Sequence, residues 1–191
     1  MKFIVIEGDN GTGKDSLAQQ LKKCEKIDII TYNSDIKKAE KVAKKFSSEK
    51  KVRMFLGYNK LCSDLVKSNN QDSLLIRYWI STLAAAYADG VYDYERIIEL
   101  SKRCIDKLEV PDCIIRLKCN YSERIKRIEG RNSNDYDDKT IQRDIKYQYI
   151  TDKLKEQLSM IKWIDINTTD KSKEIVFKNI YEEIHNKDLE L

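Results

Sequence analysis

A short glycine-rich run near the start of the chain has the residue types and the spacing to bind an anion. The run is Gly8-Asp9-Asn10-Gly11-Thr12-Gly13-Lys14. It fits the pattern G-x-x-x-x-G-K, in which glycines let successive backbone N–H groups turn inward and the lysine reaches the outer phosphates as a mobile point charge. We expect the phosphates of a nucleoside triphosphate to be bound by Gly8, Asn10, Gly11, Thr12, Gly13, Lys14, Asp15 and Ser16.

The two residues after the lysine are candidates for binding magnesium. Loops of this pattern usually carry Ser or Thr directly after the lysine as a magnesium ligand, whereas here Asp15 holds that position and Ser16 follows it. Nucleoside monophosphate kinases often show the variant G-x-x-G-x-G-K-x-[ST], which this chain meets. We therefore expect ATP and Mg²⁺ as cofactors, with Ser16 as the metal ligand. Asp15 has two interpretations: a charge that matches the helix dipole, or a contact to magnesium.

The segments on either side of the run are the elements that such a loop needs. Residues 2–6 (KFIVI) are apolar and rich in β-branched side chains, which is typical of a buried strand. Residues 15–23 (DSLAQQLKK) place Leu17 and Leu21 four apart among good helix formers, so a helix should open directly from the loop. The positive end of that helix would point at the bound phosphates.

Strand-like and helix-like segments alternate along the rest of the chain. Because short strands separated by longer helices need crossover connections, the alternation predicts a parallel sheet covered on both faces. We expect an α/β single domain over residues 1–191 with the fold of P-loop NTPases, a three-layer sandwich whose five strands lie in the order 2-3-1-4-5. The further strands expected are 27–32, 73–78, 113–117 and 163–166. The further helices expected are 36–46, 52–67, 79–88, 92–108, 122–129 with Ser122 as its cap, 138–160 and 172–185.

Composition excludes several other classes of protein. The chain has 191 residues, of which 36% are charged and 41% hydrophobic, with six glycines and one proline. These values exclude collagen-like and proline-rich disordered chains and disfavour an all-β fold, which needs more turn residues. No segment has the apolar length that crosses a membrane or the pattern of a signal peptide, so we expect a cytoplasmic protein without a membrane partner.

Charge and cysteine content indicate which kinds of ligand and metal the protein could bind. The net charge of +4 is too small to indicate nucleic acid, and it suits an acidic small-molecule ligand. The basic stretch 37–51 is either a patch for a polyanion or, as its interrupting acidic residues favour, a solvated helix face. Five cysteines without a C-x-x-C pair, together with a single histidine, favour reduced thiols over a zinc site.

The phosphate-binding loop and the order of the elements make the chain resemble the thymidylate kinases. Residues 7–14 (EGDNGTGK) are similar to the family's loop E-G-x-D-G-x-G-K, and the likeness extends along the whole chain in the order and length of the elements. The family's D-R-Y motif meets Ile76-Arg77-Tyr78, and the serine and alanine that follow it meet Ser81 and Ala84. The family's lid pattern, R-I-x-x-R-x-x-x-D-R-x-E, meets residues 127–138.

The resemblance implies an enzyme that transfers the γ-phosphate of ATP to a nucleoside monophosphate, with dTMP as the best guess. Arg77 would clamp the phosphate of the acceptor, and Arg131, in a lid at about 129–140, would close over the transferring phosphoryl group. The catalytic residues implied are Lys14, Arg77 and Arg131. The substrate-binding residues implied are Asp9, Arg77, Tyr78, Ser81 and Tyr87.

The resemblance also implies a homodimer built on helices from the middle of the chain. The apolar face around Leu83, Ala84 and Val91 suits such an interface and suits the core equally well.

The acceptor side departs from the family pattern. Residues 32–35 (YNSD) replace the family's R-E-P-G-G, and residues 57–60 (GYNK) lack an expected arginine. Ile76 replaces the acid of D-R-Y, Ala85-Ala86 replaces a Tyr-Gln pair, and Tyr136 replaces an arginine of the lid. The family pattern is therefore kept on the donor side and rewritten on the acceptor side.

Two explanations of this departure remain open. The acceptor differs from dTMP, with replacement contacts from Lys60, Arg53, Tyr58 or Tyr87, or the chain binds nucleotide and transfers phosphate poorly. A deoxynucleoside kinase is a further alternative, which needs a general base near the end of the second strand, where Asp35 is a loose fit. A regulatory nucleotide-binding module with weak or no kinase activity is the alternative outside the enzymes.

Overall fold

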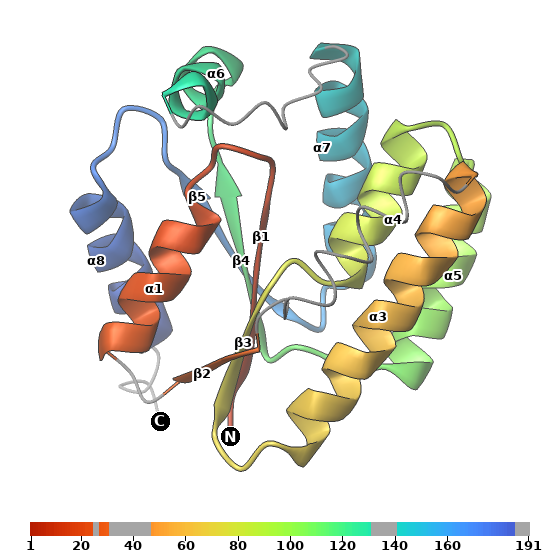
Figure 1. Ribbon diagram of the computed structural model, residues 1–191, viewed down its shortest axis with the longest axis horizontal. Helices are drawn as coiled ribbons and strands as arrows, with labels where there is room; N and C mark the ends of the chain where they lie inside the picture. The colour runs from red at the N-terminus through yellow and green to blue at the C-terminus, as the bar shows by residue number, and fades with distance from the viewer. Residues whose placement is uncertain (25–26, 31–46, 131–140, 186–191) are drawn as a thin grey trace.

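The computed structural model describes residues 1–24, 27–30, 47–130 and 141–185. Within them, five parallel strands form one sheet in the order β2-β3-β1-β4-β5 (Figure 1). The predicted parallel sheet and its strand order are therefore confirmed. The strands are β1 (Phe3–Gly8), β2 (Ile27–Ile30), β3 (Asp72–Ile76), β4 (Cys113–Lys118) and β5 (Lys162–Asn167).

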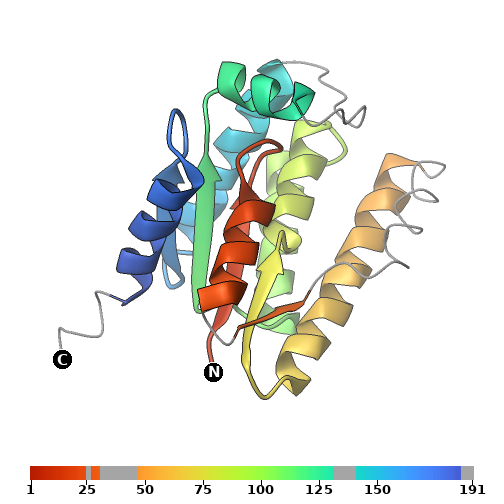
Figure 2. The same cartoon turned by 60° about the vertical axis from the view of Figure 1, so that its left-hand side comes forward.

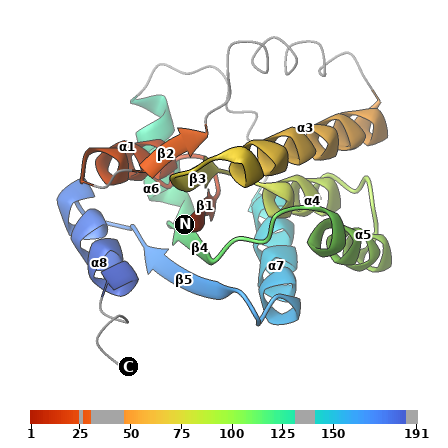
Figure 3. The same ribbon diagram turned by 90° about the horizontal axis from the view of Figure 1, so that it is seen from below.

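Helices cover both faces of the sheet, which gives the three layers of the predicted fold (Figure 3). One face carries α1 (Lys14–Cys24) and α8 (Lys173–His185). The other face carries α3 (Ser48–Ser68), α4 (Trp79–Ala88), α5 (Tyr94–Lys107) and α7 (Ile141–Gln157). The remaining described helix, α6 (Tyr121–Glu129), lies above the ends of the central strands in Figures 1 and 2.

The central strand β1 is buried along its whole length. Its side chains alternate between two hydrophobic cores: Ile4 and Ile6 pack with α1 and α8, whereas Phe3 and Val5 pack with the helices of the other face. Burial on both sides explains why this strand is a continuous apolar run in the sequence. Because β3 and β4 flank β1, the loop after β1 emerges in the middle of the sheet's carboxyl edge, where open α/β sheets bind ligands.

Some element boundaries differ from the sequence-based predictions. Asn120 caps α6, since its side-chain oxygen accepts a hydrogen bond of 2.9 Å from the backbone N–H of Glu123. The prediction of Ser122 as the cap was therefore wrong, because Ser122 lies inside the helix. The predicted helix 36–46 and the first residues of the predicted helix 138–160 lie outside the described residues.

The apolar face around Leu83 and Ala84 belongs to the chain's own core. Both residues are fully buried, and Val91 packs against the same cluster. The predicted homodimer stays a prediction. The five cysteines are free thiols. None of the described helices is both long and apolar enough to cross a membrane.

Candidate active site

The loop between β1 and α1 has the backbone that a phosphate-binding loop requires. Gly8, Gly11 and Gly13 all have positive φ angles, of 138°, 79° and 97°. A Cβ atom at Gly8 would meet the carbonyl oxygen of Leu117 on β4, and one at Gly11 would lie 2.9 Å from the carbonyl oxygen of Arg124 on α6. Glycine is needed at these two positions both for conformation and for the close approach of neighbouring backbone.

Lys14 is held inside this loop. Its side chain is only 6% exposed, and its ammonium donates a hydrogen bond of 2.6 Å to the carbonyl oxygen of Asp9. The hydroxyl of Thr12 donates to the same carbonyl at 2.8 Å. Burial lowers the pKa of Lys14 well below its usual value, and the nearby charge of Arg77 lowers it further. A bound phosphate would oppose both effects, because it would pair with the ammonium.

The two residues proposed for magnesium occupy different environments in the first turn of α1. Asp15 is exposed, where its charge matches the helix dipole, and Ser16 is half-buried on the wall of a cavity. No group of three or more His, Cys, Asp or Glu side chains that could hold a metal occurs in the part of the chain that the structure describes. The Ser16 hydroxyl is an oxygen donor of the kind that Mg²⁺ takes beside phosphate oxygens, so the residues present are compatible with the magnesium site expected from the sequence.

A cavity of about 410 Å³ opens beside the loop, between α1, α6 and the segment that joins β5 to α8. Arg127 of α6 forms part of its wall, and its guanidinium donates to the carbonyl oxygen of Thr168 at 2.8 Å and to the carboxylate of Glu123 at 3.0 Å. The volume is in the range of small-molecule sites. The cavity is also lined by Thr12, Gly13, Ser16, Gln20, Lys171 and Ser172.

Arg77 reaches the loop from the end of β3. It has a left-handed backbone, with φ of 68°, which is strained for a residue other than glycine. Its backbone N–H donates to Ile6 at 2.9 Å, and its guanidinium donates to the side-chain oxygen of Asn10 at 2.7 Å. Parallel pairing of β1 with β3 thus brings residues 67 positions apart into contact.

A buried carboxylate fixes the turn that carries Arg77. Glu7, at 1% exposure, accepts a hydrogen bond of 3.0 Å from the backbone N–H of Tyr78 and another from the hydroxyl of Ser81. The Ser81 hydroxyl also lies 3.0 Å from that of Tyr147 on α7. Burial raises the pKa of Glu7, although Ser81 and the charge of Arg77 oppose the shift. This chain of contacts joins β1, α4 and α7 beneath the Arg77 side chain.

Arg124 is the buried arginine that sequence reasoning missed. At 2% exposure, it donates to the carbonyl oxygen of Asn10 at 2.9 Å, to the carboxylate of Asp9 at 3.2 Å and to that of Asp144 on α7 at 2.9 Å. A buried arginine is tolerated only when its donors are paired. No spacing in the sequence points to it, because its loop partners lie more than 110 residues away.

The structure brings together only some of the side chains expected to bind substrate. Arg77 and Ser81 lie beside the loop, and Asp9 joins them with its carboxylate turned to Arg124. The ring of Tyr78, in contrast, lies in the hydrophobic core, where its hydroxyl donates to the carbonyl oxygen of Glu109. Tyr78 therefore takes part in the site through its backbone N–H, which donates to Glu7, and its side chain does not, because the turn after β3 points the ring into the core.

The remaining predicted residues lie farther along the helices or outside the described part. Tyr87 is six residues after Ser81 on α4, and its ring lies 6.1 Å from that of Tyr149 on α7. Arg131 and residues 131–140 of the predicted lid lie outside the described residues, as does Asp35. One further buried polar pair was not predicted: the amide of Asn59 on α3 donates to the hydroxyl of Thr82 on α4 at 3.0 Å.

Comparison with solved structures identifies proteins that share this fold. A thymidylate kinase from Candida albicans superposes with a TM-score of 0.74 and 16% identity, over 98% of this chain and 92% of that one. A deoxyadenosine kinase from M. mycoides with bound dATP superposes with a TM-score of 0.72 and 14% identity, over 95% of this chain and 98% of that one. At these identities the likeness shows the fold alone, which is that of a P-loop nucleoside and nucleotide kinase.

Sequence comparison gives the family. The family model described as an AAA domain (AAA_18) matches residues 4–151, which is most of the chain, and the chain therefore belongs to this family. No curated protein matches the sequence.

Proposed function

We propose that this protein is an ATP-dependent kinase that transfers the γ-phosphate to a nucleoside monophosphate, with dTMP as the acceptor that the resemblance names. The observation that carries the proposal is the meeting of two cations at one loop. Lys14 is buried within the loop, and Arg77 is bonded to Asn10 of the same loop closely enough to lower the pKa of Lys14. Their mutual repulsion is relieved when phosphate groups lie between them.

The donor nucleotide fits the loop and the adjoining cavity. Inward-facing N–H groups and the N-terminus of α1 would hold its β- and γ-phosphates, with Lys14 as their counter-charge. The cavity beside Gly13 and Ser16 has room for the nucleoside part, with Arg127 as one wall. Magnesium, held by the Ser16 hydroxyl and the phosphates, would neutralise charge on the triphosphate.

The acceptor would lie on the Arg77 side of the loop. An oxygen of its phosphate attacks the γ-phosphorus in line, a new P–O bond forms, and the bond to ADP breaks. A phosphate oxygen is already ionised at neutral pH, so this attack needs no general base. Glu7 then serves to orient the turn through Tyr78 and Ser81 rather than to accept a proton.

A deoxynucleoside kinase is the second candidate, and one observation favours it. Arg143, near the start of α7, donates a hydrogen bond of 2.6 Å to the carboxylate of Asp89, the residue just after α4, so its charge is partly neutralised by the protein itself. An acceptor without a phosphate would need fewer cations on this side. Its 5′-hydroxyl would need a general base, and Asp35, the residue considered from the sequence, lies outside the described residues.

An assay of ADP release with a panel of nucleoside monophosphates and nucleosides tests the proposal. We expect ADP release above the ATP-only rate with at least one monophosphate and none with the matching nucleoside. Lys14→Ala serves as the inactive control. Transfer to nucleosides alone would favour the second candidate, and tight ATP binding without any transfer would point to a regulatory module.

A further inference from the structure

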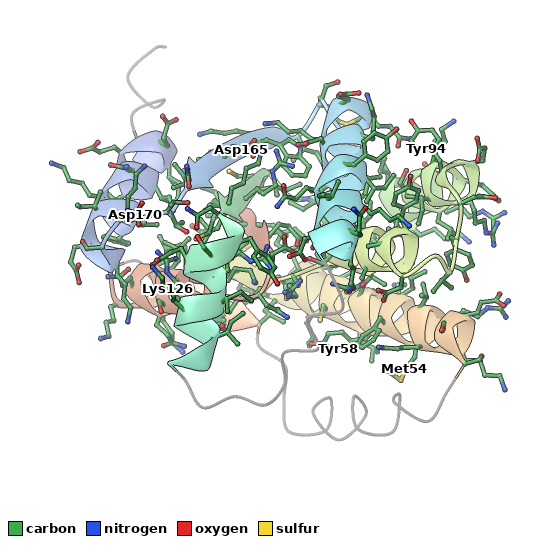
Figure 4. The ribbon with its side chains drawn as sticks, turned by 90° about the horizontal axis from the view of Figure 1, so that it is seen from above. Met54, Tyr58, Tyr94, Lys126, Asp165 and Asp170 are labelled. Carbon is green, nitrogen blue, oxygen red and sulfur yellow. The ribbon has the colours of Figure 1, made fainter. Side chains whose placement is uncertain are left out.

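We propose that Arg124 is a positioning residue that sets the direction of the acceptor clamp Arg77 through Asn10. The proposal rests on the proposed function, because it assigns Arg124 a part in the same phosphoryl transfer. Figure 4, seen from above, shows α6, which carries both Arg124 and the labelled Lys126, between α1 and α7.

Two independent contacts dock α6 on the phosphate loop. The first is the backbone approach at Gly11, where any larger residue would collide with the carbonyl group of Arg124. The second is the Arg124 side chain, whose guanidinium bonds the Asn10 carbonyl and the Asp9 carboxylate. The loop therefore has a shape that depends on α6 as well as on its own glycines.

Asn10 connects the two arginines. Its carbonyl oxygen accepts from Arg124 at 2.9 Å, while its side-chain oxygen accepts from Arg77 at 2.7 Å. The guanidinium of Arg77 also lies 3.5 Å from the Ser81 hydroxyl, so Asn10 holds it more closely than Ser81 does. Without Arg124, the peptide group after Asn10 loses its buried partner and can rotate, and the bond to Arg77 moves with it.

Asp144 connects Arg124 to α7, one of the two helices on the proposed acceptor side. Its carboxylate accepts from Arg124 at 2.9 Å and lies on α7, which also carries Tyr147 against Ser81. α7 packs closely along α4, the helix that follows Arg77. Arg124 thus joins the donor loop to the two helices of the acceptor side, although it contacts neither Lys14 nor Arg77 directly in any bond that the structure shows.

The role assigned to Arg124 is separable from simple stabilisation by a double-mutant cycle. We expect Arg124→Lys, which keeps the charge and loses the planar fork, to reduce kcat/KM for the acceptor about 30-fold while the Kd for ATP changes less than about 3-fold. In an Arg77→Ala background, the same change should cost less than about 3-fold, because the clamp it positions is gone. Asp144→Asn should act in the same direction with a smaller effect.

Arg116→Gln is the matched control. Arg116 is also a buried arginine with two carboxylate partners, Asp152 and Asp165, but it makes no hydrogen bond to the phosphate loop among the described residues. The Arg116→Gln substitution should lower the melting temperature without changing kcat/KM for the acceptor.

Three outcomes decide the proposal. The proposal is supported if Arg124→Lys lowers kcat/KM for the acceptor without weakening ATP binding, and if this loss is absent in the Arg77→Ala background. Equal losses in both backgrounds, or a loss confined to ATP binding, overturn it. If the wild-type protein transfers phosphate to no acceptor, the proposed function itself fails, and that result is distinct from additive losses in an active enzyme.

Discussion

The donor side and the acceptor side of the candidate site are built in different ways. The proposed donor side is one continuous segment, residues 8–16, in which three glycines have positive φ angles and Lys14 is buried. The proposed acceptor side is assembled from side chains of β1, α4, α7 and the turn after β3, namely Glu7, Ser81, Tyr147 and Arg77. A site made of backbone is recognisable as a short motif, whereas a site made of distant side chains has no local pattern.

The two sides also differ in what their burial requires. The glycine loop satisfies some of its polar groups within itself, since Thr12 and Lys14 both donate to the carbonyl oxygen of Asp9, and Arg124 of α6 satisfies the carbonyl oxygen of Asn10. The acceptor side depends on the buried carboxylate of Glu7, which accepts from Tyr78 and Ser81, and on Arg124, which joins the loop to Asp144 of α7; both are buried ionic groups that need specific partners on other elements. Substitutions on this side should therefore change stability as well as activity.

Loss of the donor lysine should give the largest effect. We expect Lys14→Ala to reduce turnover at least about 100-fold and to weaken ATP binding, because the loop loses the buried cation proposed to pair with the outer phosphates. Calorimetric titration with ATP and the ADP-release assay measure the two effects. Lys22→Ala, an exposed change in the last turn of the same helix, is the control, and equal behaviour of the two variants would refute the loop assignment.

Removal of the acceptor clamp should separate the two sides. Arg77→Ala should reduce kcat/KM for the acceptor about 100-fold, with the Kd for ATP little changed, because a charge-assisted contact to the acceptor is lost. Arg96→Ala, a half-exposed arginine paired with Glu99 on α5, should leave both constants unchanged. An effect of Arg77→Ala on ATP alone would place this residue on the donor side.

The buried Glu7 offers a test by pH. Its raised pKa means that the contribution of Glu7 to stability is greatest below the ordinary Glu pKa and is lost as the pH rises through the folded-state pKa. Glu7→Gln should therefore flatten this pH dependence, raise the melting temperature by about 3 °C near pH 7.5, and lower kcat/KM for the acceptor about tenfold. Thermal melts from pH 5 to pH 8 measure the first effect. The exposed Glu95→Gln on α5 is the control, and a lower melting temperature for Glu7→Gln would contradict the argument.

The smallest effect on activity should come from the ion pair between Arg116 of β4 and Asp165 of β5, which makes no hydrogen bond to the loop among the described residues. Burial would raise the pKa of Asp165, but hydrogen bonds from Arg116 and Lys155 outweigh it and hold the pKa well below its usual range. The stability this gives is present at neutral pH and is lost as the pH falls below about 4. Asp165→Asn should cost about 1–3 kcal/mol at pH 7 and leave the kinetics unchanged.

Urea unfolding at pH 7 and pH 3.5 measures this cost. The difference between Asp165→Asn and the wild type should shrink at the lower pH. Asp64→Asn, which alters an exposed pair with Lys60 on α3, should cost less than about 1 kcal/mol. A large kinetic effect of Asp165→Asn would show that the network around Arg116 extends into the site.

Within the described residues, local patterns predicted the strands and helices of the fold closely. The apolar strands and the amphipathic helices were recognisable because hydrophobic periodicity reports burial directly. The cap of α6 was assigned to Ser122 instead of Asn120, because both are good capping residues and only the position of the Glu123 N–H distinguishes them.

The candidate site was predicted in part. Lys14 and the glycines followed from spacing, and Arg77 followed from a resemblance. Arg124 and the inward turn of Tyr78 had no signal in the sequence, since each depends on a contact between elements far apart in the chain.

The sequence by itself determined the order of strands and helices, the phosphate loop and its lysine, because these depend on residues within a few positions of one another. Only the tertiary structure decided how Arg77 meets Asn10, and how Arg124 ties that loop to α7. The physical reason is that charged groups inside a protein are stable only beside their partners, and parallel strand pairing and helix docking select those partners.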